Sequence, residues 1–287
     1  MKVAFLAAAL ILSFMGEVQA FDTSGKLALT GGVSSIEGSG GGGIASWALI
    51  GTYATRDQIG VNAFHTDSKL SDYNLESNGL MIGLYNRLEI SLAQQSFDTK
   101  FVGGDLGIGQ GRRLRQNIFG AKVRLFGDAV LDQDSWLPQV SFGVQFKKHK
   151  EGAIVKSLGA KDDSGIDYYL AATKIFLAQS ILVSTTVRMT RANELGILGF
   201  GGDRNDSYKP QVEGSLGYLV CRSVLAGVEY RTKSRNLNAV EEDNWADIFV
   251  AWTPTKNISL TGAYLMLGNI ATKDKQRGAY GSLQVGF

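Results

Sequence analysis

The residues best suited to covalent chemistry are a histidine and a serine three positions apart, in the stretch His65-Thr66-Asp67-Ser68. A serine nucleophile needs a base within hydrogen-bond reach and a third group that orients the base. The other histidine of the chain is His149, and both histidines fall at or beyond the ends of predicted strands. Solvated loop histidines are far more frequent than catalytic ones, so the sequence predicts no catalytic residue.

Two other patterns resemble ligand sites. The glycines of GDLGIGQGRR, residues 104–113, precede two arginines, but they lie in a loop that leads into a strand. A phosphate-binding loop needs a strand before it and a helix after it. The acids Asp128, Asp132 and Asp134 lack the central glycine and final glutamate of a helical calcium loop. We therefore predict no cofactor and no metal.

The elements that must position these residues alternate in hydropathy with a period of two. Val140, Phe142, Val144 and Phe146 alternate with polar or small residues, which is the pattern of a half-buried strand. The alternation predicts about fourteen strands, each long enough to cross a bilayer at a tilt. They are residues 25–33, 45–56, 58–67, 76–86, 87–97, 113–126, 136–147, 165–176, 180–191, 209–220, 222–233, 244–253, 257–267 and 278–287.

The connections between these strands alternate between short and long. Tight turns at 56–57 and 86–87 alternate with longer loops, including 66–75, 98–112, 192–208 and 268–277. Bacterial outer-membrane barrels have short periplasmic turns, longer extracellular loops and an even number of strands. Because every backbone polar group in hydrocarbon must be paired, a spanning sheet has to close on itself. The predicted fold is all-β, a closed antiparallel transmembrane β-barrel.

The first twenty residues and the composition indicate the cellular compartment of the protein. Residues 1–20 contain one lysine, an apolar run from Val3 to Leu12 that extends to Met15, and a close at Val18-Gln19-Ala20, which is typical of a secretory signal peptide cleaved after Ala20. We expect residues 21–287 to form a single barrel domain in the bacterial outer membrane. The lone cysteine, Cys221, excludes a disulfide framework. The net charge of +2 gives no support to nucleic-acid binding.

The polar faces of the strands predict which residues line the lumen. Arg or Lys side chains facing lipid at mid-depth would cost ~2–4 kcal/mol each, so charged side chains should point inward. The predicted lumen-lining residues are Lys122, Arg124, Gln139, Gln145, Lys147, Arg188, Glu213, Glu229, Arg231 and Asp247. Their mixed signs argue against a strongly selective pore. They either line a narrow polar passage or neutralise one another in a filled barrel, and barrel size leaves both open.

Aromatic residues near strand ends predict girdles at the two membrane interfaces. The girdle tryptophans are predicted to be Trp47, Trp136, Trp245 and Trp252. The alternative explanation is that aromatic residues simply favour strands.

The last predicted strand, AYGSLQVGF, places Gly281, Leu283, Val285 and Phe287 on one face. This pattern resembles the carboxy-terminal signal of outer-membrane barrels, which implies recognition by the barrel assembly machinery. We expect this face to meet lipid and the strand to pair with residues 26–30 across the seam. The expected partners are the assembly machinery, periplasmic chaperones, and the lipid and lipopolysaccharide of the outer membrane, without nucleic acid.

Four sequence blocks extend over essentially the whole mature chain. They are TGGVSSIEGSGGGG (30–43), GAKVRLFGDAVLDQDSWLPQ (120–139), GAKDDSGIDYYLAATKIF (159–176) and LGNIATKDKQRGAYGSLQVGF (267–287). Together they resemble a family of exported proteins of Gram-negative bacteria, domain-of-unknown-function family 3034. The resemblance implies one barrel domain and carries over neither an activity nor functional residues.

The barrel itself favours a porin-like or transporter-like passage for small polar or amphipathic solutes. One alternative is a lipid-modifying outer-membrane enzyme, which would need a Ser and a His that converge at the lipid-facing rim. The other is a non-conducting structural or adhesive barrel, whose lumen paired charges would block. The glycine-rich segment 31–43 could fold into the lumen and constrict it. Deleting residues 38–43 should then raise conductance.

Overall fold

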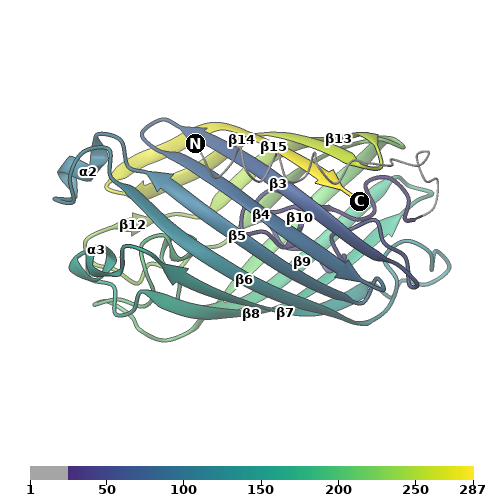
Figure 1. Ribbon diagram of the computed structural model, residues 1–287, viewed down its shortest axis with the longest axis horizontal. Helices are drawn as coiled ribbons and strands as arrows, with labels where there is room; N and C mark the ends of the chain where they lie inside the picture. The colour runs from purple at the N-terminus through teal and green to yellow at the C-terminus, as the bar shows by residue number, and fades with distance from the viewer. Residues whose placement is uncertain (1–24) are drawn as a thin grey trace, which may run out of the picture.

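The computed structural model describes residues 25–287, in which twelve long antiparallel strands form a barrel (Figure 1). Six of these strands make up the first half of the barrel: β3 (Ile59–Leu70), β4 (Asn74–Leu84), β5 (Leu88–Asp98), β6 (Arg113–Phe126), β7 (Gln139–His149) and β8 (Ser164–Phe176). The other six complete it: β9 (Ile181–Thr190), β10 (Lys209–Cys221), β11 (Val224–Arg231), β13 (Trp245–Thr255), β14 (Ile258–Ala271) and β15 (Lys273–Gly286).

The barrel closes between its first and last long strands. Strand β15 pairs with β14 on one side and with β3 on the other, where Leu283 lies opposite His65. Each long strand therefore pairs with a long strand on either side, and the wall of the barrel has no unpaired edge, as hydrocarbon requires. The predicted pairing of the last strand with residues 26–30 is wrong, because that segment is not in the barrel wall.

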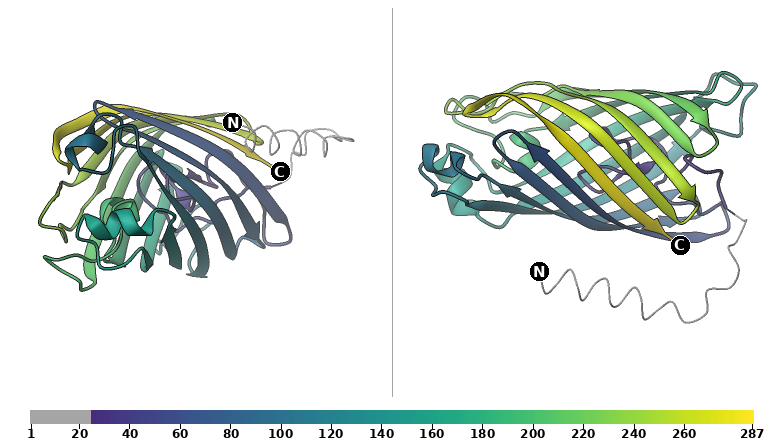
Figure 2. Two further views of the ribbon diagram at one scale, coloured as in Figure 1. Left: turned by 60° about the vertical axis from the view of Figure 1, so that its left-hand side comes forward. Right: turned by 90° about the horizontal axis from the view of Figure 1, so that it is seen from above.

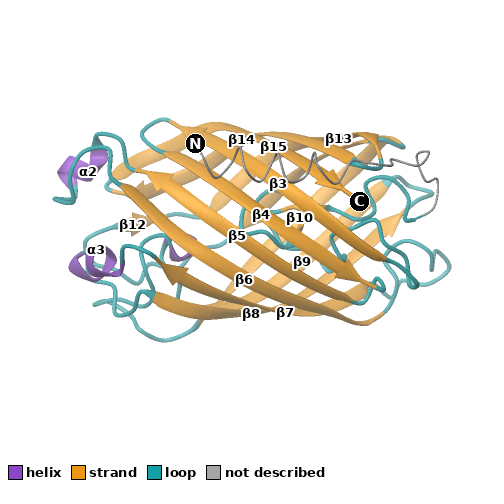
Figure 3. Ribbon diagram, viewed as in Figure 1, coloured by secondary structure: helices purple, strands orange, loops and turns teal. Residues whose placement is uncertain are grey.

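The two ends of the barrel differ in the length of their connections (Figures 1 and 3). One end carries α2 (Val102–Asp105), α3 (Gly152–Ser157), the 3₁₀ turn η1 (Glu194–Gly196) and the short strand β12 (Glu241–Glu242), which pairs with β14. The other end carries mainly tight turns and the carboxy-terminal residue, so we assign it to the periplasm and the first end to the cell exterior. The expected long loops at 66–75 and 268–277 are instead tight turns, because β3, β4, β14 and β15 extend into them.

Residues 25–55 run through the inside of the barrel (Figure 2). We call them the inner segment. It contains only the short paired strands β1 (Val33–Ser34) and β2 (Gly40–Gly41), and every residue from 29 to 52 is buried. The prediction of barrel strands at 25–33 and 45–56 is therefore wrong, which lowers the count from fourteen to twelve. A spanning strand buries one face, whereas residues 29–52 are buried on all sides.

The other twelve predicted strands recur within a few residues of their predicted positions, and 113–126 has the same bounds as β6. Their apolar faces point outward, as Leu80, Leu92 and Phe119 show, each about half exposed. Their polar faces point into the lumen. In residues 25–287 no helix is both long and apolar enough to cross a membrane. The predicted signal peptide, residues 1–20, lies outside the described residues.

Candidate functional site

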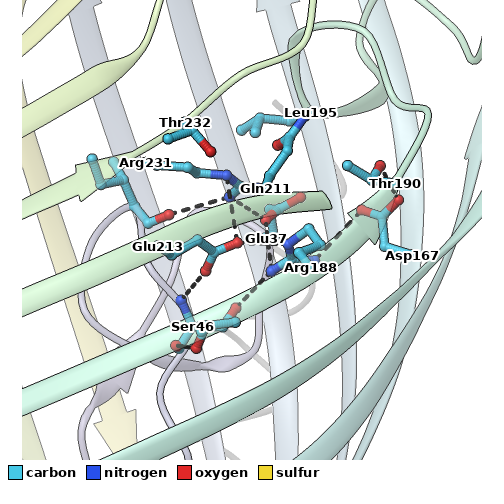
Figure 4. Close-up of polar contacts among 12 residues, drawn as sticks. Glu37, Ser46, Asp167, Arg188, Thr190, Leu195, Gln211, Glu213, Arg231 and Thr232 are labelled. Atoms are coloured by element: carbon cyan, nitrogen blue, oxygen red, sulfur yellow. Dashed lines mark hydrogen bonds and ion pairs between the residues drawn. The ribbon is translucent and has the colours of Figure 1, made fainter. Parts of the chain in front are cut away.

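The lumen contains a charge network centred on Glu37 of the inner segment (Figure 4). Arg231 donates to Glu37 at 2.6 Å, Lys147 also donates to it, and Arg188 lies 3.6 Å from the same carboxylate. Two carboxylates of the barrel wall complete the network. Asp167 pairs with Lys147 at 2.6 Å, and Glu213 accepts from Arg188 at 2.6 Å. Three cations thus face three carboxylates, all almost fully buried.

Other wall residues bind the backbone of the inner segment rather than its side chains. Glu89 on β5 accepts hydrogen bonds from the backbone N–H groups of Gly40 and Gly51, at 2.9 and 2.8 Å. Lys122 on β6 pairs with Glu89 at 2.9 Å and donates to the carbonyls of Gly40 and Trp47. Buried carboxylates and ammonium groups need such partners, because an unpaired buried charge is strongly destabilising.

The same arrangement recurs elsewhere around the lumen, on β7, β10 and β11. Glu213 accepts from the N–H of Ser46 at 2.7 Å, and Glu229 accepts from the N–H of Ile44 at 2.9 Å. Gln139 and Ser141 both donate to the carbonyl of Ala48 at 2.6 Å. The wall therefore holds the inner segment mainly through backbone groups, with Glu37 as its one charged contact to the wall network.

Glycine allows this close approach at one position in particular. A Cβ atom on Gly40 would stand 2.6 Å from the Cα of Gly51 and 2.8 Å from Oε2 of Glu89. The two glycines thus pack backbone against backbone, with the Glu89 carboxylate between their N–H groups. The glycine-rich run of the sequence therefore fits the lumen because side chains there would displace the groups that hold it.

Nine of the ten predicted lumen residues are buried in the lumen. Arg124 shares their orientation but lies at the periplasmic rim, where it donates to the carbonyl of Gly127 and pairs with Asp128 at 2.9 Å. Asp247 is 1% exposed, and neither of its carboxylate oxygens has a hydrogen-bond partner in residues 25–287. It lies directly opposite Glu229 in the β11–β13 register.

Three buried charged residues of the lumen, Glu37, Glu89 and Asp167, were missed from the sequence. Glu89 and Asp167 lie on the polar faces of predicted strands, so the rule that found the others also applies to them. Glu37 has no such signal, because it lies in a loop-like segment outside any alternating pattern.

Two of the four predicted girdle tryptophans are wrong. Trp47 belongs to the inner segment, is 1% exposed and donates its indole N–H to Ser215. Trp245 is 3% exposed and faces the lumen at the extracellular end. Trp252 is half exposed on the outer face of β13, and Trp136 is 85% exposed in a periplasmic connection beside Phe176. Inward-facing aromatic residues occur here because the inner segment provides a core for them to pack against.

The predicted assembly face lies on the outside of the barrel. Leu283 and Phe287 are 42% and 62% exposed, whereas Ser282 and Gln284 on either side of Leu283 are buried in the lumen. Gln284 accepts a hydrogen bond from Ser34 of the inner segment at 2.7 Å.

The candidate catalytic and ligand residues are not brought together. His65 points outward and bonds to Asn78 at 2.7 Å, whereas Ser68 is buried on the inner face of the same strand. Asp128 accepts from the N–H groups of Val130 and Leu131, as an acid that caps a turn does. Within residues 25–287, no cluster of three or more His, Cys, Asp or Glu side chains could hold a metal ion.

A second charge cluster lies under the extracellular connections. Lys233 donates to Glu194 at 2.6 Å, lies 3.4 Å from Glu242, and stacks over the ring of Trp245 at 4.3 Å. Burial, with the nearby Glu194 charge, raises the pKa of Glu242 to about 8. Burial also raises the pKa of Glu194, against the effect of Lys233. One lysine thus faces two carboxyl groups.

We call η1, β12 and the connections that carry them the extracellular cap, and this cluster makes the stability of the cap dependent on pH. Both folded-state pKa values lie above the ordinary value of 4.5, so the stabilisation is complete below about pH 4.5 and is lost as the pH rises towards about 8. We expect the urea midpoint of cap opening, measured by proteolysis of the loops, to fall over this range. Glu242→Gln should flatten that dependence, and an unchanged slope in this variant would contradict the assignment.

The fold and the lumen define the class of protein. A closed twelve-stranded antiparallel barrel with an apolar outer face, short turns at one end and longer loops at the other is an outer-membrane β-barrel protein, located in the bacterial outer membrane. The chain belongs to the family described as "Protein of unknown function (DUF3034)", whose sequence profile matches residues 30–284.

Solved structures of outer-membrane porins share the fold. The KdgM porin in complex with disordered oligogalacturonate has a TM-score of 0.51 and 10% identity, over 79% of this chain and 99% of that chain. The NanC porin in a rhombohedral crystal form has a TM-score of 0.50 and 10% identity, over 79% of this chain and 98% of that chain. A search of curated proteins finds no match.

Proposed function

We propose that this protein is a porin-like passage for small polar or amphipathic solutes, closed by its inner segment in the conformation described above. The lumen is filled, because every residue from 29 to 52 is buried. Passage therefore requires the inner segment to leave the lumen or to rearrange within it, while the twelve-stranded wall stays closed.

One observation carries this proposal: the charges of the lumen belong to the wall and not to the segment that fills it. The inner segment contributes Glu37 to the network, and its other charged residue, Lys26, donates to carbonyls of the segment itself. The wall contributes four cations and five carboxylates, which are Lys122, Lys147, Arg188, Arg231, Glu89, Asp167, Glu213, Glu229 and Asp247. Without the inner segment, the wall would be a polar and nearly neutral surface that water can fill.

The energetic cost of buried charges also favours a passage over a lumen that is permanently filled. Replacing a buried ion network by well-packed apolar residues of similar volume is often neutral or stabilising by about 1–4 kcal/mol. A barrel that only needs a solid core has no use for so many buried charges. A wall that must be stable both against the inner segment and against water does need them.

Shortening the inner segment tests the proposal. Deletion of residues 38–43 removes the glycines that approach Glu89 and Glu229, so the segment should no longer fit the lumen. We expect stepwise single-channel currents in planar bilayers from this variant and little or no current from the intact protein. Heat-modifiable migration on gels shows whether the variant is folded. A folded variant that gives no single-channel current would overturn the proposal of a passage.

The alternative favoured by a specific observation is a non-conducting structural barrel. The inner segment is bonded on several sides by wall residues, including Glu89, Glu213 and Glu229. A silent deletion variant would support this alternative. The proposal assigns no catalytic residue, since His65 and Ser68 lie on opposite faces of β3. We also propose the outward face of Leu283 and Phe287 as the contact for the barrel assembly machinery.

A further inference from the structure

The outer surface of β4–β7 has a groove of about 750 Å³ that extends to the extracellular end of β7 at Lys148 and Lys150. Apolar side chains form its floor, among them Leu80, Leu92, Phe119 and Phe146. Polar side chains form its extracellular rim: Asn78, Gln94, Asn117, Lys148 and Lys150. A surface that faces lipid on a membrane barrel is normally apolar without interruption, so this rim needs an explanation.

The strand register aligns the rim into one row across the sheet. Asn78 lies opposite Gln94, Gln94 opposite Asn117, and Asn117 opposite Lys148. We call Asn78, Gln94 and Asn117 the amide row. Gln94 donates to Asn117 at 2.9 Å, and Asn78 bonds to His65 at 2.7 Å. Each of these amide side chains has more hydrogen-bond donors and acceptors than these two bonds use.

The amide row lies close to the middle of the barrel wall. On β4 only Leu80, Ile82 and Leu84 point outward between the row and the periplasmic turn. Three alternate positions extend over only about 13 Å along a strand, whereas the apolar band of such barrels is about 25 Å tall. The amides are therefore at a depth where hydrocarbon would leave them unsatisfied, and they require a polar partner that reaches below the usual interface.

Unneutralised positive charge identifies the chemistry of that partner. Arg115 beside the groove is paired with Glu151 at 2.6 Å, and Arg113 lies 3.7 Å from Asp98. Lys148 and Lys150 are exposed and form no ion pair within residues 25–287. A second copy of this surface would bring lysine towards lysine, so an anion is the better complement.

We propose that this groove binds the lipid A part of lipopolysaccharide, with acyl chains on its floor, sugar hydroxyl and amide groups against the amide row, and a phosphate at Lys148 and Lys150. Lipid A is a phosphorylated disaccharide that carries several acyl chains. Its polar head is thus wide enough to meet the amide row, which crosses three strands. Lys148 and Lys150 lie at the extracellular end of β7, on the side of the outer leaflet.

Binding to the purified full-length barrel in detergent tests this site, by native mass spectrometry with bisphosphoryl and monophosphoryl lipid A as probes. The variant Lys148→Gln/Lys150→Gln removes both charges and keeps side-chain length. Juxtamembrane lysines attract anionic lipid by amounts that correspond to roughly a fivefold change each. We expect the double variant to bind bisphosphoryl lipid A at least tenfold more weakly.

Lys275→Gln is the matched control, because Lys275 is an exposed lysine at the same end of the barrel that does not line the groove. It should bind lipid A like the unchanged protein. Equal affinities of the double variant and this control would overturn the proposal. So would a Gln94→Leu/Asn117→Leu variant that lowers the fraction of dimer and leaves lipid A binding intact, since that result assigns the row to a protein interface.

Discussion

Replacing Glu37 by glutamine is expected to open the lumen. In the unchanged protein, Lys147, Arg188 and Arg231 are balanced by Glu37, Asp167 and Glu213. The variant leaves three buried cations facing two carboxylates. Breaking a buried ion network by removing one partner costs about 3–5 kcal/mol. That penalty applies only while the inner segment is in place, because water can solvate the cations once the segment has left.

The expected readout is the appearance of single-channel current, which reports the ratio of open to closed barrels. A cost of this size raises the ratio of open to closed barrels on the order of a hundredfold or more, so single-channel currents should appear in planar bilayers. The wall keeps its closed hydrogen-bond ladder, and the variant should still migrate as a folded barrel.

Glu241→Gln is the matched control for this charge removal. Glu241 pairs with Arg235 at 2.9 Å on the exposed extracellular surface, where an ion pair contributes about 0–1 kcal/mol. This control should remain as closed as the unchanged protein. If Glu37→Gln and Glu241→Gln behave alike, Glu37 does not hold the inner segment in the lumen.

A methyl group on Gly40 is expected to have the second largest effect. The Cβ of Gly40→Ala would lie 2.6 Å from the Cα of Gly51 and 2.8 Å from Oε2 of Glu89. Backbone cannot rotate away as a side chain can, so the two glycines must separate and their N–H bonds to Glu89 must lengthen. Overpacking of this kind typically costs about 1–3 kcal/mol. We expect channel openings that are rarer than those of Glu37→Gln.

Gly262→Ala provides the control for this substitution. Gly262 lies on the outer face of β14, and a Cβ there would meet no atom within 4 Å. The control should leave both the conductance and the urea midpoint unchanged. Openings at the same frequency in both variants would show that the effect is not local to the contact between Gly40 and Gly51.

The wall of the barrel was predictable because its physical signal is local. A strand between lipid and a polar lumen must alternate, and β6 through β11 could be located from this alternation alone. The same rule placed Lys122, Arg188 and Glu213 on the inner face, since lipid excludes charge. It applies to Glu89 and Asp167 as well. Local pattern therefore determined the sheet and the direction of its side chains.

The inner segment was not predictable in the same way. Residues 25–33 and 45–56 alternate enough to resemble strands, yet every residue from 29 to 52 is buried by residues from distant parts of the chain. In the sequence, Trp47 and Trp245 have the positions expected of membrane-interface residues. In the structure, both are buried in the filled lumen. Whether a segment forms part of the barrel wall or fills the lumen depends on contacts with residues far away in the sequence. No local sequence pattern encodes such contacts.

The sequence by itself thus determined a closed transmembrane barrel with charges on its inner face, because hydrocarbon imposes pairing and polarity on every strand. Only the tertiary structure decided that twelve strands form the wall and that residues 25–55 fill the lumen. It also decided that the inward charges bind Glu37 and the backbone of that segment. The reason is that all twelve strands together form the lumen. Which segment fits the lumen therefore depends on the inward-facing side chains of all these strands.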